Sequence, residues 1–226
     1  MKLIFDIETV GMNFNDLDDS QQEYLLRYAI KEPNQEIRES KIFDAIRYLN
    51  LYPFTAKIVS LALLNIETEK LLVLFLGKTE DSFNDSENNI KYRAFSEPEL
   101  IKIFWEQVAK SNQLISFNGK NFDLPFITIR SAIHQIKPTK NFHKKYRKNH
   151  IDLLDEFTFY GKIRKFNFDF YCKSFGIKSP KTIDVNGMKI NELFYNDEVK
   201  KIAEYCAKDV KATFELYKIW KEFLNY

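Results

Sequence analysis

The chain contains 226 residues, of which 45% are hydrophobic and 29% are charged, as is ordinary for a water-soluble globular protein. This length allows one large domain with a well-buried core, or two small domains. The formal net charge of +2 neither demands nor excludes a nucleic-acid partner, because local patches rather than net charge steer polyanions. Most of the 21 Phe and 12 Tyr are expected to fill the core, although exposed rings could stack on nucleobases.

Cysteine and histidine are too few and too dispersed for a disulfide framework or a zinc site. The two cysteines are Cys172 and Cys206, and the three histidines show no metal-ligand spacing with them. Acidic residues follow the start of the chain too closely for a signal peptide, and no apolar run has transmembrane length. We therefore expect a reduced, cytoplasmic location and no membrane partner.

Short apolar runs alternate with segments of helical periodicity along the chain. The first buried strand is expected at residues 2–7, followed by a polar and helical insertion over 11–53. The stretch 79–89 is rich in acids and poor in apolar residues, which predicts a solvated loop. The other expected strands are 57–66, 70–76 and 113–117, and the expected helices are 18–31, 40–50, 97–110, 122–135, 152–159, 167–175 and 197–224. Without a repeat or a low-complexity linker, this alternation favours one α/β domain over residues 1–226.

Two acidic residues stand at the end of the first strand. Asp6 and Glu8 are two positions apart, so their side chains leave the same face, which they share with the apolar Ile4. Burying both carboxylates without a partner would cost several kcal/mol. They are therefore either metal ligands or solvated acids at a strand end, and this pattern alone does not decide between the two.

A third acidic residue follows the strand at 113–117. Asn118 and Gly119 permit a sharp turn, and Asp123 falls at the start of the next helix. A helix N-terminus favours a carboxylate, so capping is the simpler explanation for Asp123 taken alone. The same reasoning makes a helix N-cap the expected role of Asp152.

The last helix carries Tyr205 and Asp209 one turn apart and therefore on one face. Its apolar stripe, which includes Ile202, Cys206 and Val210, runs beside that pair. Asp209 is therefore expected at the edge of the buried face, where a metal ligand fits better than a solvated charge. The alternative is an exposed Asp209 that pairs with a neighbouring lysine.

Together, three segments resemble the motifs of the DEDD 3′–5′ exonuclease superfamily. They are Phe5-Asp6-Ile7-Glu8-Thr9, Phe117-Asn118-Gly119-Lys120-Asn121-Phe122-Asp123-Leu124-Pro125 and Tyr205-Cys206-Ala207-Lys208-Asp209, and their order and spread match as well. The closest resemblance is to the bacterial predicted exonucleases related to the proofreading domain of family B DNA polymerases. Similar stretches at 57–62, 150–153 and 184–187 extend the resemblance over nearly the whole chain, least clearly over 11–53.

The resemblance implies an RNase H-like fold, with a mixed five-stranded sheet flanked by helices and the acids at one edge. By motif position, Asp6 would bridge two divalent cations, Mg²⁺ or Mn²⁺. Glu8 and Asp209 would hold the catalytic cation, and Asp123 the second. Tyr205, four residues before Asp209, corresponds to the Tyr-type group (DEDDy), in which this tyrosine orients the attacking water. A tyrosine pKa near 10 favours orientation over proton removal at neutral pH.

Substrate contacts are expected from further residues. The segment 137–150 interleaves basic and aromatic side chains, which is the composition of a single-strand binding surface; a solvated basic loop is the alternative. Thr9 and Asn118 are candidates for contact with the terminal nucleotide, although turn formation explains Asn118 equally well. The candidates within the basic segment are Lys144, Lys145 and Arg147.

The sequence thus predicts a 3′–5′ exonuclease that removes nucleotides from single-stranded 3′ ends, with DNA favoured over RNA as the partner. Two alternatives remain open: a nucleic-acid-binding or polymerase-partner module that has lost turnover, and a 3′–5′ exoribonuclease. The presence of all four acids and Tyr205 argues against the first alternative, because a binding module has no need for converging carboxylates beside a phosphate. No sequence feature points to recognition of a 2′-hydroxyl.

Overall fold

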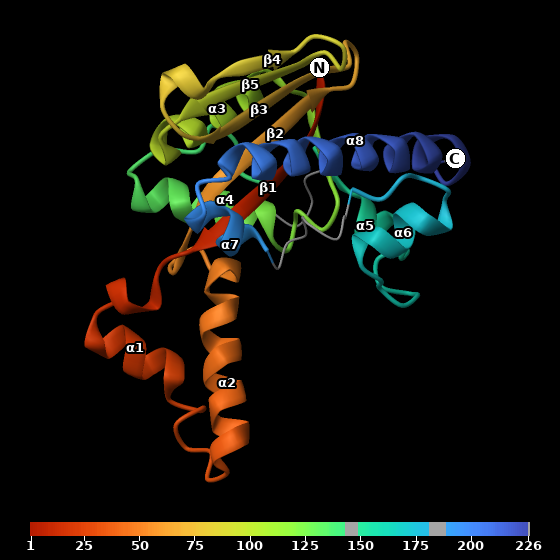
Figure 1. Ribbon diagram of the computed structural model, residues 1–226. Coiled ribbons are helices and arrows are strands. Elements are labelled where there is room, and N and C mark those ends of the chain that lie inside the picture. Colours follow the sequence, from red (N-terminus) through yellow and green to blue (C-terminus); the bar gives the residue numbers. More distant parts are fainter. Residues whose placement is uncertain (143–148, 181–188, 226) are drawn as a thin grey trace.

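The computed structural model describes residues 1–142, 149–180 and 189–225 (Figure 1). They form an α/β fold around a seven-stranded mixed sheet with the strand order β4-β5-β3-β2-β1-β6-β7. The strands are β1 (Lys2–Gly11), β2 (Ala56–Asn65), β3 (Lys70–Leu76), β4 (Phe83–Asp85), β5 (Ile90–Phe95), β6 (Gln113–Ser116) and β7 (His150–Asp152). The expected α/β class and mixed sheet are confirmed, whereas the expected count of five strands is wrong.

Eight α-helices are present in the described ranges, and most follow the predicted segments. None of these helices has both the length and the apolar composition that crossing a membrane requires. The helices are α1 (Asp19–Leu26), α2 (Gln35–Arg47), α3 (Glu97–Lys110), α4 (Asp123–Ile133), α5 (Leu153–Phe157), α6 (Phe168–Ser174), α7 (Ile190–Tyr195) and α8 (Val199–Phe223).

β4 and β5 extend the sheet beyond the expected edge at β3. β5 pairs parallel with β3, and β4 pairs antiparallel with β5 inside the stretch that was expected to be a solvated loop. Phe83 of β4 stacks on Tyr92 of β5 with ring centroids 4.3 Å apart. This aromatic contact gives the acidic stretch a buried anchor, which its composition alone did not reveal.

β1 lies at the centre of the sheet, antiparallel to β2 and parallel to β6. Its side chains alternate between two apolar cores. Ile4 packs in the core that α8 covers, whereas Phe5 and Ile7 pack in the core that α3 and α4 cover. Asp6 and Glu8 share the α8 side with Ile4, as the strand periodicity predicts, and the register with β2 shifts directly after Glu8.

α8 is a long helix that crosses one face of the sheet (Figure 1). Its buried residues include the predicted stripe of Ile202, Cys206, Val210, Phe214 and Tyr217. Burial of such a stripe holds the helix in one rotation about its axis. The residues at the edge of the stripe, Asp209 among them, are therefore turned toward β1.

The predicted insertion between β1 and β2 is a helical arm of α1 and α2 that projects away from the sheet (Figure 1). The second predicted helix was placed too late, because α2 begins at Gln35. The Asn34 side chain accepts a hydrogen bond from the Ile37 backbone N–H at 3.1 Å and so starts the helix there. The arm exposes the aromatic side chains of Tyr24, Tyr28, Phe43, Tyr52 and Phe54.

A buried ion pair fixes the helices on the opposite face of the sheet from α8. The Glu97 carboxylate at the start of α3 accepts hydrogen bonds from the Arg130 guanidinium of α4 at 2.8 and 2.6 Å. The Ile58 backbone N–H donates to the same carboxylate at 2.8 Å. These bonds satisfy two charges that are almost inaccessible to water, and they tie α3 and α4 to β2.

Candidate active site

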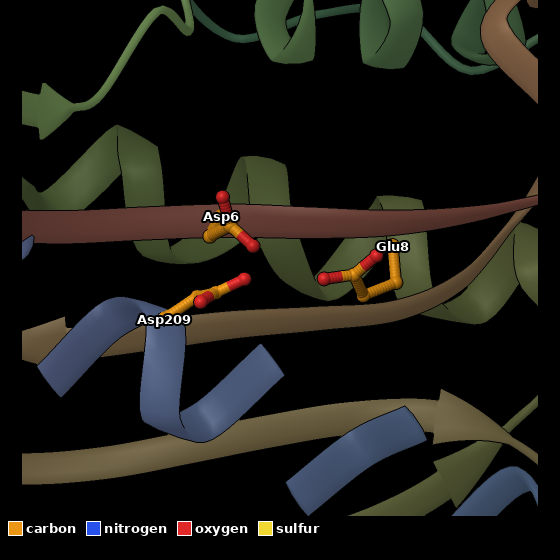
Figure 2. Close-up of side chains that lie close together, drawn as sticks. All are labelled: Asp6, Glu8 and Asp209. Carbon is orange, nitrogen blue, oxygen red and sulfur yellow. The ribbon is translucent and has the colours of Figure 1, made fainter. Parts of the chain in front are cut away.

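Three carboxylates from two elements converge beside the central strand. Asp6 and Glu8 come from β1 and Asp209 comes from α8, and one oxygen atom of each lies within 4.8 Å of the other two. Figure 2 shows the three side chains directed toward one another between the strand and the helix. The structure thus brings Asp6 and Glu8, which are two positions apart on β1, together with Asp209, which lies about two hundred positions later in the sequence.

Asp123 reaches the same strand from the first turn of α4. Its Oδ1 accepts a hydrogen bond from the backbone N–H of Ile7 at 3.1 Å, and Ile7 lies between Asp6 and Glu8. The residue is only 4% exposed. The N-cap position of α4 belongs to Phe122, so the Asp123 carboxylate serves the strand as well as the start of the helix.

Mutual repulsion and burial shape the protonation of these acids. Burial, followed by the charges of Asp123, Asp209 and Glu8, raises the pKa of Asp6 well above its usual value. Burial and the charges of Asp209 and Asp123 do the same to the pKa of Glu8. Burial also raises the pKa of Asp123 to about 7. Within the described residues, the charges that raise the pKa of Asp6 and of Glu8 all belong to other carboxylates.

This donor set suits a hard divalent cation. All its donors are carboxylate oxygens, the ligands that Mg²⁺ and Mn²⁺ prefer over nitrogen or sulfur. A cation bound among the three converging oxygens would relieve the repulsion that adds to burial in raising the pKa values of Asp6 and Glu8. Asp6, Glu8 and Asp209 could therefore hold one cation, and Asp123 is near enough to the same strand to serve a second.

Tyr205 lies one helical turn before Asp209 and is buried beside the cluster. Burial, then the charges of Asp209, Glu8 and Asp6, raise the pKa of its hydroxyl, and a hydrogen bond with the Asp209 side chain adds to the shift. The phenol is therefore a protonated hydrogen-bond donor at neutral pH. The geometry suits it for orienting a polar group rather than for removing a proton.

Sequence reasoning missed Cys206 as a neighbour of the cluster, because its place in the apolar stripe marked it only as core. Its Sγ lies 3.6 Å from the Asp6 carbonyl oxygen and 3.8 Å from Asp6 Oδ2. The thiol is buried, and that burial, followed by the charges of Asp6 and Glu8, raises its pKa well above the usual value. Cys206 therefore stays a neutral thiol that supports the position of Asp6.

The turn that leads into α4 is held by Asp152 at the end of β7. The Asp152 carboxylate accepts hydrogen bonds from the backbone N–H groups of Asn118 at 2.8 Å, Lys120 at 2.9 Å and Leu154 at 3.1 Å. The last of these bonds confirms the predicted N-cap of α5. The other two, which the sequence did not predict, fix the turn from which Asp123 is positioned.

The Asn118–Gly119 turn is also closely packed. Asn118 adopts a left-handed backbone conformation with φ of 64°, which confirms its predicted role in turn formation. A Cβ atom on Gly119 would lie 2.3 Å from Ser116 Oγ, so only glycine fits. Ser116 Oγ in turn contacts His150 Nε2 at 2.8 Å, so the turn rests on a buried polar pair.

The remaining predicted substrate contacts, Thr9 and three basic residues, stay predictions. The Thr9 hydroxyl donates a hydrogen bond to the Asn50 carbonyl oxygen at 2.7 Å and so joins β1 to the base of the arm. The basic candidates Lys144, Lys145 and Arg147 lie outside the described residues, so their role stays a prediction.

The chain is thus an α/β protein in which the central strand of a mixed sheet and a crossing helix bring carboxylates together. Residues 51–223 match the model of a family described as predicted 3′–5′ exonucleases related to the exonuclease domain of PolB, and the chain belongs to this family. The matched range contains Asp123, Tyr205 and Asp209, whereas Asp6 and Glu8 precede it.

Similar proteins include both a short protein and long polymerases. The chain is 36% identical over 135 residues to the uncharacterized protein MJ0365 of Methanocaldococcus jannaschii, a match that covers 55% of this chain and 74% of that protein. It is 26% identical over 168 residues to DNA polymerase 1 of Sulfurisphaera ohwakuensis, covering 70% of this chain and 19% of the polymerase.

The fold is also shared with the family B DNA polymerase of Pyrobaculum calidifontis. The TM-score is 0.58 and the identity 16%, over 97% of this chain and 24% of the polymerase chain. The chain therefore spans about a fifth to a quarter of the length of the polymerases that it resembles.

Proposed function

We propose that this protein is a metal-dependent 3′–5′ exonuclease that hydrolyses phosphodiester bonds from single-stranded 3′ ends, with DNA favoured over RNA. The convergence of Asp6, Glu8 and Asp209 within 4.8 Å carries the proposal. Two of these acids lie outside the range that defines the family match, yet they meet the third, which lies inside it. Converging carboxylates have a direct use in binding cations beside a phosphate.

In this proposal, Asp6, Glu8 and Asp209 would hold one divalent cation, Mg²⁺ or Mn²⁺. Asp123, held against β1 by its bond from Ile7, would hold a second together with Asp6. The bound pair would supply a water activated at neutral pH and would stabilise the charge that develops on the phosphate and the departing 3′ oxygen.

Tyr205 acts in this proposal through its hydroxyl as a donor. The raised pKa keeps the phenol protonated, so it orients the attacking water instead of taking a proton from it. This assignment makes the protein a Tyr-type (DEDDy) member with an RNase H-like core. We further propose that residues 1–226 act as one exonuclease domain, in which the arm at 11–53 is an insertion.

A gel time course on 5′-labelled single-stranded DNA and RNA of matched sequence tests the proposal. The reactions contain Mg²⁺, Mn²⁺ or EDTA, and Asp209→Asn provides the inactive control. We expect a ladder that shortens from the 3′ end only with a divalent cation, only in the wild type and faster on DNA. Faster shortening of RNA would make the protein an exoribonuclease. Intact strands under every condition, with binding retained, would overturn the proposal and favour a binding or polymerase-partner module.

A further inference from the structure

The loop between α5 and α6 has an unusual backbone. Phe159, Tyr160 and Gly161 occupy consecutive left-handed conformations, with φ of 49°, 58° and 88°. Aromatic residues rarely adopt this conformation because it costs free energy. Backbone strain of this kind occurs most often at functional sites. The turn holds the Tyr160 side chain in solvent, where it is 70% exposed.

A second pair of rings lies next to this turn at the start of α6. Phe166 and Phe170 stack face to face, with centroids 4.2 Å apart and planes 11° from parallel. Phe170 is 49% exposed, so this pair is not part of the core. The inward side of α6 is fixed separately, because Phe168 and Tyr171 pack edge-to-face on Phe117 at 4.9 and 5.3 Å.

The charge along the segment that carries Phe166 and Phe170 is positive, whereas the Tyr160 hydroxyl donates a hydrogen bond to Glu156 Oε1 and Lys165 Nζ lies 3.7 Å from Asp155 Oδ1. Residues 158–175 contain four basic residues and one acidic residue, and that acid, Asp169, pairs with Lys173 at 2.8 Å. The Arg164 guanidinium lies 5.1 Å from the centroid of the Phe166 ring. Exposed rings with arginine and lysine beside them are the surface that single-stranded nucleic acids bind, through base stacking and phosphate attraction.

This surface is continuous with the turn of the candidate active site. The Lys120 ammonium lies 5.5 Å from the centroid of the Tyr160 ring and 3.2 Å from Asp155 Oδ2 on α5. The Lys120 backbone N–H is bound by Asp152, which also holds Asn118 in the turn before Asp123. Tyr160 therefore lies beside the Lys120 side chain, which belongs to the same turn as Asn118.

We infer that the surface of Tyr160, Arg164, Lys165, Phe166 and Phe170, called here the α5–α6 surface, binds single-stranded nucleic acid on the 5′ side of the terminal nucleotide. Bases stack on Tyr160 and extend the Phe166–Phe170 stack, and Arg164 and Lys165 attract the phosphates. The inference rests on the proposed function, since it assigns the path by which that substrate reaches the acids.

The helical arm is the other exposed aromatic region, and its charge is less favourable. Residues 11–55 contain eight acidic and five basic residues. The arm nevertheless carries a matched pair, because the Arg27 guanidinium lies 3.6 Å from the centroid of the exposed Tyr24 ring. Like Arg164 and Phe166, this pair combines an arginine with an exposed ring, so its substitution is a control for the position of the binding surface.

The test is binding of 5′-fluorescein oligothymidylates of 4 and 12 nucleotides, measured by fluorescence anisotropy in EDTA so that no cleavage occurs. We expect Phe166→Ala/Phe170→Ala and, separately, Arg164→Glu to weaken binding of the 12-mer about tenfold or more and to change binding of the 4-mer less than about twofold. Arg164→Glu alters an exposed side chain only, so it tests the surface even if the double variant folds poorly. The 12-mer affinity of Arg164→Glu should also depend less steeply on salt.

Tyr24→Ala/Arg27→Glu on the arm and Lys102→Glu on α3 serve as controls, and neither should weaken binding of the 12-mer. Equal loss in the arm variant and the Arg164→Glu variant, or unchanged affinity in both α5–α6 variants, would overturn the inference. The proposed function fails on a different result, which is the absence of metal-dependent shortening by the wild type. If the wild type cleaves but the α5–α6 variants bind normally, the proposed function would stand and the proposed role of the α5–α6 surface would be rejected.

Discussion

The backbone N–H of Ile7 donates a hydrogen bond to Asp123 Oδ1 at 3.1 Å, across 116 positions of sequence. Since Ile7 stands between Asp6 and Glu8, the bond sets the distance of the fourth acid from the other three. The spacing of the four carboxylates is therefore determined by a hydrogen bond from the backbone of β1 to a side chain of α4, as well as by side-chain packing.

Asp209→Asn should abolish turnover while stabilising the metal-free protein. Loss of one ligand should lower kcat by at least about a thousandfold in the gel assay. Without metal, removing one of the converging charges should raise the midpoint of thermal unfolding by a few degrees, or about 2–4 °C for each kcal/mol of repulsion relieved. The matched control is Glu204→Gln, an exposed acid on the same helix, which should leave both quantities unchanged. Activity of Asp209→Asn within a few-fold of wild type would contradict the assignment.

Tyr205→Phe should lower kcat by about 10- to 100-fold, because a hydrogen bond to a charged or reacting group contributes about 1.5–3 kcal/mol. The ring stays in the apolar cluster that it shares with Val10 and Ile202, so the fold and the KM should change little. Steady-state kinetics on a single-stranded substrate measure the two constants separately. A tyrosine that acted as a proton acceptor would shift the pH profile in this variant. An orienting tyrosine lowers kcat at every pH.

The pH dependence of stability should differ between the metal-free and metal-bound states. Burial raises the pKa of Asp123 from its ordinary value to about 7, so the folded state binds more protons than the unfolded state between about pH 4 and pH 7. In EDTA, the free energy of unfolding should therefore fall as pH rises through this window, by about 3–4 kcal/mol. Added Mg²⁺ should flatten or reverse the slope, because it binds the ionised carboxylates of the folded state.

Urea unfolding at pH 5 and pH 7.5, with and without Mg²⁺, measures this difference. Asp123→Asn is the matched control, since it removes one titrating group and should reduce the slope in EDTA. If the free energy of unfolding in EDTA instead rose from pH 5 to pH 7.5, the pKa values of these acids would not be raised in the folded protein.

The parts of this site that follow local periodicity could be predicted from the sequence. Two-residue spacing placed Asp6 and Glu8 on the face of Ile4, and the helical stripe placed Asp209 at its edge, because both patterns are properties of a single element. β5 was missed although Ile90 and Tyr92 alternate with basic residues, since so short a run stood beside an acidic stretch.

Contacts between distant segments were beyond such reasoning. The bonds from Ile7 to Asp123 and from Asn118 to Asp152 each have a backbone N–H donor, which any residue except proline supplies and which therefore leaves no mark in the sequence. Exposed rings are equally hidden, because Phe166 and Phe170 read in the sequence like the many phenylalanines of the core. Exposed rings differ from core rings only by their position in the structure. Phe170 on α6 and Phe166 just before it are exposed, whereas Phe168 on the same helix packs on Phe117.

Asp152→Asn tests whether the turn before α4 positions Asp123 for its proposed role. Asp152 accepts three backbone hydrogen bonds through its two oxygens, and an asparagine would present an NH₂ group to donors. We expect the free energy of unfolding to fall by about 2–4 kcal/mol, since buried N–H groups lose their acceptor. We also expect kcat to fall at least about tenfold at temperatures where the variant is fully folded.

The matched control for this variant is Asp155→Asn, three residues along the chain. Within the described residues, the Asp155 carboxylate pairs with two lysine side chains, at 3.2 Å to Lys120 and 3.7 Å to Lys165, and such partly exposed pairs contribute less than about 1 kcal/mol. Its kcat should therefore stay close to that of the wild type. If Asp152→Asn lowered stability but left kcat and the metal dependence unchanged, Asp152 would support the fold without setting the geometry of the acids.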